Sequence, residues 1–111
     1  MSTQMPIDSM GNSIPALRLK KGDAHTLSVT GTSNINASAF SADTRIISLY
    51  ATSDIFIKFG DNSVTASSSD HFFPAGIYYD IAIGGDNAPH YAHIAAIAAS
   101  NDGTLYISEK E

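Results

Sequence analysis

The sequence contains no cysteine in its 111 residues. Such a chain forms no disulfide, no thiolate zinc site and no iron–sulfur cluster, and it has no cysteine nucleophile. Charged residues are also scarce, at 15% of the chain, and the excess of acidic over basic residues gives a net charge of −5. Because phosphate backbones and anionic lipids repel an acidic chain, neither nucleic acid nor a membrane surface is an expected partner.

Long apolar runs and enzyme signatures are missing as well. No run approaches the ~18 residues of a membrane span, and the first residues carry neither the basic region nor the apolar core of a signal peptide. The sequence therefore predicts a soluble product made in the cytoplasm. It contains no G-x-S-x-G nucleophile elbow, no phosphate-binding P-loop and no dinucleotide-binding glycine motif. We expect a protein that is not an enzyme and needs no cofactor.

Neither the histidines nor the acidic loops predict a metal site. His90 and His93 are the only two histidines close in sequence, and on a strand their spacing sends them to opposite faces. On a helix they would share a face but would still need a third ligand. Asp and Asn recur in three loops without the spacing of a calcium loop, and these residues favour turns because their side chains bond nearby backbone. We therefore expect no bound metal.

What the sequence does have, from residue 16 onward, is apolar alternation with a period of two, which is the repeat of a β-strand. Strands are predicted over residues 16–20, 25–30, 44–51, 54–59, 77–83 and 105–107. The stretch 90–99 fits a helix as well, but its short length and the turn after it favour a strand. Seven or eight short strands in one domain-sized chain predict an all-β, single-domain antiparallel β-sandwich of jelly-roll type over residues 16–111.

The connections between these strands fall into two kinds. Short links over residues 21–23, 52–53 and 100–103 resemble hairpin turns, and Pro74-Ala75-Gly76 forms a turn that opens the next strand. The loops over residues 31–43 and 60–70 are longer than turns require and consist of small, mostly polar residues. Loops of this length are either mobile or functional, and side chains this small suit contact with another surface.

The first 15 residues are predicted to form an extended N-terminal arm. They hold two prolines, one glycine and, after Met1, four large apolar side chains at no regular spacing. The arm is either a disordered terminus or a segment that becomes ordered against a neighbouring subunit. In the second case its contact residues are Met5, Ile7, Met10 and Ile14.

Two further groups of residues are candidates for an interface. Arg18, Lys20 and Lys21 lie together where the arm meets the first strand, either as a solvated strand end or as a contact for an acidic partner. Phe56 and Tyr78 each lie on the opposite face of their strand from the predicted core residues, so both are expected to point outward. Surplus aromatic side chains on an outer face indicate an interface, unless loops or the arm cover them.

Three segments carry a resemblance to a known class of proteins. Residues 44–61 read TRIISLYATSDIFIKFGD, residues 72–81 read FFPAGIYYDI, and residues 103–109 read GTLYISE. In this order they resemble small virion structural proteins of tailed bacteriophages. In that group a strand ending L-x-A-T-x-D leads into a strand that closes on Phe-Gly, a P-A-G turn opens the next strand, and a G-T-L-Y-I strand finishes the chain. The resemblance covers more than half of the sequence and leaves the arm outside.

The resemblance implies a β-sandwich that serves as a capsid decoration or cement protein on the outer surface of a phage head. Its partner would be the major capsid protein, and it would form a homo-oligomer, with a trimer preferred from the habits of the family. Its location would be the virion after synthesis in the host cytoplasm. Two alternatives stay open: a head–tail connector, collar or tail protein, and a jelly-roll module that binds carbohydrate for host adsorption. The chain has no tryptophan, which weakens the carbohydrate alternative.

Overall fold

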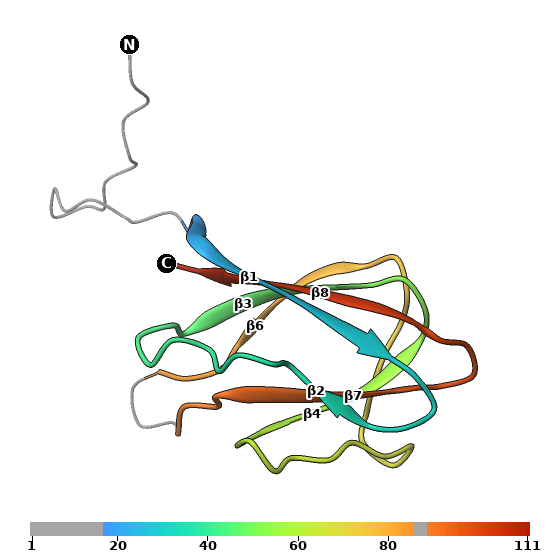
Figure 1. The fold of residues 1–111 in the computed structure, drawn as a ribbon. Helices are drawn as coiled ribbons and strands as arrows, with labels where there is room; N and C mark the ends of the chain where they lie inside the picture. The colour runs from blue at the N-terminus through green and yellow to red at the C-terminus, as the bar shows by residue number, and fades with distance from the viewer. Residues whose placement is uncertain (1–16, 86–88) are drawn as a thin grey trace, which may run out of the picture.

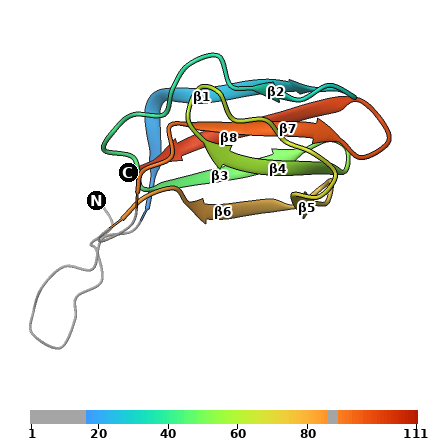
Figure 2. The same cartoon turned by 90° about the horizontal axis from the view of Figure 1, so that it is seen from below.

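The structure, a computed structural model, describes residues 17–85 and 89–111. These residues form two four-stranded antiparallel sheets that pack face to face, and they contain no helix (Figures 1 and 2). The strands are β1 (Leu19–Val29), β2 (Asn34–Ile35), β3 (Ile46–Ala51), β4 (Ile55–Gly60), β5 (His71–Phe73), β6 (Tyr78–Ala82), β7 (His93–Ala98) and β8 (Gly103–Lys110). The predicted β-sandwich is confirmed, and the ambiguous stretch 90–99 contains strand β7. The predicted arm lies outside the described residues.

The order of the strands is that of a jelly roll. Sheet one has the order β1-β8-β3-β6, and sheet two has the order β2-β7-β4-β5. The first strand therefore pairs with the eighth, the second with the seventh, the third with the sixth and the fourth with the fifth. Such nested pairing arises when a long hairpin of chain is rolled into two sheets, which is the jelly-roll arrangement of two Greek keys.

The predicted first hairpin is wrong, because residues 19–29 form one bent strand. Leu19 pairs with Lys110 and Ala24 pairs with Ser108, so β1 advances five residues while β8 advances two. The extra residues form a bulge that contains Gly22, whose φ of 81° lies in the left-handed region that favours glycine. The turn signal at residues 21–23 was therefore a signal for a bulge.

The other two predicted hairpins are also wrong, because each link crosses between the sheets. Thr52 and Ser53 connect β3 of sheet one to β4 of sheet two, and residues 99–102 connect β7 of sheet two to β8 of sheet one. A local sequence pattern marks where the chain reverses but does not say which strand it will pair with. Only the packing of all eight strands decides that.

The core lies between the two sheets and follows the predicted alternation. Its large side chains, each at most 6% exposed, are Leu27, Val29, Phe40, Ile47, Leu49, Ile55, Ile57, Phe73, Ile83, Ile94, Leu105 and Ile107. Both sheets contribute to this layer, so neither sheet can bury its apolar face without the other. The sandwich is therefore a single cooperative core.

Buried polar contacts fix the loop over residues 31–43 to the sandwich. The Asn36 side-chain oxygen accepts a hydrogen bond from the backbone nitrogen of Ile94 at 2.9 Å, and the backbone nitrogen of Phe40 donates to Ala92 at 2.8 Å. Phe40 itself is buried in the core. These contacts hold the middle of the loop against the sandwich.

Candidate docking surfaces

The segments that carry the phage resemblance meet at one end of the sandwich. Thr52 and Thr104 exchange two hydrogen bonds, of 3.0 Å between backbone atoms and 2.8 Å to the Thr52 hydroxyl. The Asp54 carboxylate accepts a hydrogen bond from the backbone nitrogen of Ala75 at 2.9 Å. A Cβ atom added at Gly103 would lie 2.2 Å from the Ser53 hydroxyl oxygen. These motif residues therefore shape the links between the sheets.

Three tyrosines form a row across the outer face of sheet one. Tyr50 on β3 pairs with Tyr78 on β6 and with Tyr106 on β8, so the three side chains lie side by side on adjacent strands. Their exposed fractions are 38%, 58% and 50%, respectively. Sequence reasoning placed Tyr78 on an outer face, as observed, but it missed the row because the row depends on the register between strands distant in sequence.

Charged groups frame one end of this tyrosine row. The Lys110 ammonium lies 5.6 Å from the centre of the Tyr78 ring and 3.0 Å from the Asp80 carboxylate. The Ser48 hydroxyl also donates a hydrogen bond to Asp80, and the hydroxyl and the ammonium together lower the pKa of this carboxyl below its usual value. The row therefore ends in a fixed, ionised carboxylate beside an aromatic ring.

Phe56 lies on the outer face of sheet two, as predicted from its position in the strand. Its ring contacts that of Phe72 edge to face, with centroids 5.6 Å apart, and the register places Ile97 on its other side. Phe72 is largely exposed, whereas Phe56 is half-buried. The second sheet thus also carries an apolar strip on its outer face.

The structure does not bring the three basic candidates together as a free patch. The Lys20 ammonium lies 2.6 Å from Asp43 and 3.8 Å from Asp23, and its hydrogen bond to Asp43 raises the pKa of Lys20 and lowers that of Asp43. Arg18 lies 3.5 Å from Glu111 on the surface. Lys21 is exposed, and no ion pair is recorded for it among the described residues. Lys20 therefore serves an internal contact.

The four arm candidates lie outside the described part of the chain. They are Met5, Ile7, Met10 and Ile14.

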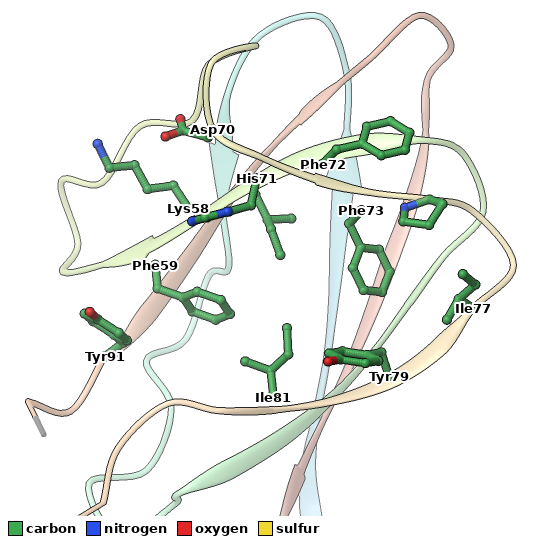
Figure 3. Close-up of a pocket in the computed structure, with 12 residues that line it drawn as sticks. Lys58, Phe59, Asp70, His71, Phe72, Phe73, Ile77, Tyr79, Ile81 and Tyr91 are labelled. Carbon is green, nitrogen blue, oxygen red and sulfur yellow. The ribbon is translucent and has the colours of Figure 1, made fainter.

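A cleft that sequence reasoning missed lies between the edge strands β5 and β6, and Figure 2 shows both strands at the same margin of the sandwich. It has a volume of about 720 Å³ and is lined mainly by apolar and aromatic side chains. Its lining consists of Ile57, Lys58, Phe59, Asp70, His71, Phe72, Phe73, Pro74, Ile77, Tyr79, Ile81 and Tyr91 (Figure 3). In the sequence, only the run of apolar and aromatic residues at positions 77–79 indicated this cleft.

Aromatic rings make up much of the cleft wall. Phe59 and Tyr91 stack with centroids 5.8 Å apart and planes inclined by 25°, and Tyr79 reaches the cleft from β6 (Figure 3). The Asp70 carboxylate is occupied by its own loop, because it accepts a hydrogen bond from the backbone nitrogen of Ser67 at 2.7 Å. The arrangement suits an apolar occupant better than a charged one.

Within residues 17–85 and 89–111, no three His, Asp or Glu side chains lie close enough to hold a metal ion. The same residues contain no helix long and apolar enough to cross a membrane. No protein-family model matches the chain, and neither a curated protein nor a solved structure is significantly similar to it. The described residues form an eight-stranded jelly roll, and a function must be argued from its surfaces.

Proposed function

We propose that this protein is a non-enzymatic structural component of a tailed-phage virion, and specifically a decoration or cement protein. In this role it binds the major capsid protein on the outer surface of the head and stabilises the junctions between capsomers as a homo-oligomer. The observation that carries the proposal is the exposed tyrosine row of Tyr50, Tyr78 and Tyr106. The resemblance of three segments to phage virion proteins supplies the setting.

The tyrosine row has the properties of a protein-binding surface. Adjacent strands lie about 4.8 Å apart, so the row forms a continuous aromatic strip on a rigid sheet. Tyrosine is enriched at interfaces because its ring buries a large apolar area while its hydroxyl keeps a hydrogen-bond partner. The side chains also start from fixed backbone positions, which limits the entropy that they lose on binding.

The placement on the head distinguishes this proposal from a connector, collar or tail protein. A decoration protein occupies many equivalent sites on a shell, whereas a connector or tail ring is present once in each particle. The copy number in purified particles therefore separates the two positions.

A carbohydrate-binding module is the second candidate, and the same tyrosine row favours it. A sugar ring stacks on an exposed aromatic ring and donates its hydroxyl hydrogens to a neighbouring carboxylate, and Asp80 lies beside the row. A glycan array separates the two candidates. Binding to one class of glycan with loss in a Tyr78→Ser variant would support this candidate, and a flat array would exclude it.

The docking role is tested by sedimenting the purified protein with expanded, undecorated phage shells. The Tyr50→Ser, Tyr106→Ser double variant should lose at least ~10-fold in affinity, since central interface tyrosines each contribute more than 1 kcal/mol. The matched control is Tyr50→Phe with Tyr106→Phe, which keeps both aromatic rings of the row and should retain most of the affinity. A double variant that sediments with shells as well as the parent would contradict the proposal.

A further inference from the structure

The cleft between β5 and β6 leaves apolar surface uncovered among the described residues. Tyr79, at 56% exposed, and Ile77, at 45%, both line it, although both belong to the inner face of the sandwich. Apolar side chains that face the interior of a two-sheet fold are normally buried, and a concave apolar surface of this kind marks a binding site. The cleft therefore calls for an occupant that is apolar.

The backbone of β6 offers such an occupant hydrogen bonds. The backbone nitrogen of Ile83 donates to Arg45 at 2.7 Å, which marks these two opposite residues as a hydrogen-bonded pair. In an antiparallel ladder such pairs alternate, so Ile81 and Tyr79 also bond towards β3. The N–H and C=O groups of Asp80 and its alternate neighbours then point to the open edge, where an extended segment can add as a strand.

The chain itself contains a segment of the matching chemistry, at residues 5–14. This segment carries the apolar side chains of Met5, Ile7, Met10 and Ile14, and Asp8 is its only charged residue. In an extended strand Met5 and Ile7 point to one side and Met10 and Ile14 to the other, so one of these two pairs faces the cleft. A proline follows both Met5 and Ile14, and the residue before a proline is restricted to extended backbone. Ten extended residues span about 33 Å, against about 17 Å for the five residues of β6, so the segment is long enough to follow the whole cleft.

We propose that residues 5–14 of one copy of this chain bind in the β5–β6 cleft of a second copy. The topology favours a second copy, because β1, which follows the segment, lies at the opposite edge of sheet one from β6. Leu17, the first described residue, lies beside Arg45 and Ile46 at the start of β3, and to reach its own cleft the segment would have to pass the end of β3 and then turn back along β6. Every copy supplies one segment and one cleft, so the exchange builds a closed oligomer at little cost in new interface.

The absence of cysteine makes a direct test possible. One chain carries Ile7→Cys and a mass tag, a second carries Tyr79→Cys, and the two are mixed and oxidised mildly. A disulfide forms only between residues whose Cα atoms come within about 7 Å. A covalent dimer of one Ile7→Cys chain and one Tyr79→Cys chain therefore shows that the segment of one copy lies in the cleft of the other. The matched control replaces the second chain by Thr26→Cys, an exposed position on β1. Met5→Cys and Met10→Cys repeat the test at other registers.

The proposal predicts a mixed dimer with Tyr79→Cys and none with Thr26→Cys. A chain with both Ile7→Cys and Tyr79→Cys that closes its disulfide internally, without dimers, would overturn the exchange, because the segment would occupy its own cleft. No crosslink at any of the three registers would overturn docking altogether. Sedimentation equilibrium gives a second measurement: the full chain should be an oligomer, and deletion of residues 1–15 should leave a folded monomer. An unchanged mass would also overturn the proposal.

These experiments use purified protein without phage particles. If the crosslinking fails, the proposed function is still tested by the binding of the protein to phage shells. Conversely, a protein that is absent from virions can still exchange its segment between copies.

Discussion

The Nε2 atom of His25 on β1 lies 2.7 Å from the Oε2 atom of Glu109 on β8, inside the sandwich. Glu109 continues the inward alternation of Leu105 and Ile107, so a carboxylate occupies a position where the pattern would place an apolar side chain. Its other oxygen accepts hydrogen bonds from the Ser41 backbone and the Thr44 hydroxyl. One buried side chain therefore ties the first strand, the last strand and the long loop together.

Replacing Glu109 by alanine is expected to lower the free energy of unfolding by about 3–5 kcal/mol, because the donors that face the carboxylate lose their partner in a buried site. Urea denaturation followed by circular dichroism measures this change. The control is Glu111→Ala, which removes only the surface contact with Arg18 and should cost less than about 1 kcal/mol. Equal losses in the two variants would mean that the buried network contributes little.

The same carboxylate predicts a dependence of stability on pH. Burial alone would raise the pKa of Glu109, but the hydrogen bonds from His25, Thr44 and Ser41 outweigh it and hold the pKa below the ordinary value of 4.5. The unfolded chain therefore takes up this proton at a higher pH than the folded protein. The contribution of Glu109 is complete above pH 4.5 and is lost as the pH falls through the lowered folded-state pKa.

Urea denaturation at a series of pH values from neutral down to that range checks this prediction. The parent should lose more stability on acidification than Glu109→Gln, which has no proton to take up. Asp80, whose pKa Ser48 and Lys110 lower, contributes to the slope of both proteins. Identical slopes for parent and variant would show that Glu109 does not carry this dependence.

Gly103 is expected to tolerate no side chain. Its added Cβ would lie 2.2 Å from the Ser53 hydroxyl and 2.8 Å from the Thr52 hydroxyl, at the link that joins the two sheets. Gly103→Ala should therefore destabilise the protein by about 1–3 kcal/mol in thermal or urea unfolding. Gly31→Ala is the matched control, since a Cβ there meets nothing within 4 Å. A Gly103 variant as stable as the control would mean that the link moves without cost.

Two isoleucines, Ile57 and Ile81, differ in how deeply they are buried. Both line the cleft, but Ile57, at 4% exposed, belongs to the buried core, whereas Ile81 on β6 is only half-buried. Ile57→Ala should cost about 2–5 kcal/mol, and Ile81→Ala should cost less because part of its side chain already meets solvent. Urea unfolding of both variants, made in the chain without residues 1–15, measures the difference. A larger loss at Ile81 would contradict the assignment of the core.

Much of the fold was predictable from the sequence because burial follows alternation. Ile55 and Ile57 share a face, and both are buried as predicted. The pairing was not predictable, because the links at residues 52–53 and 100–103 have the local form of hairpins while the nested pairing of eight strands is a long-range property. The turn signal around Gly22 was real, but a bulge satisfies it as well as a turn.

For the candidate surfaces, the sequence predicted which side chains of a single strand point outward, but not which side chains of different strands lie next to one another. The outward position of Tyr78 follows from its neighbours in sequence, whereas the tyrosine row exists only because β6, β3 and β8 align Tyr78, Tyr50 and Tyr106 in register. Lys20 illustrates the opposite case. Its neighbours suggested a free basic cluster, but Asp43, 23 residues away, accepts its hydrogen bond.

The central claim is that this protein decorates a phage head, and its copy number tests that claim most directly. Quantitative mass spectrometry of purified particles gives the ratio of this protein to the major capsid protein. The proposed function predicts a ratio near parity or a simple fraction of it. A ratio lower by about two orders of magnitude, as a single ring in each particle would give, or complete absence from the particles, would contradict the decoration role.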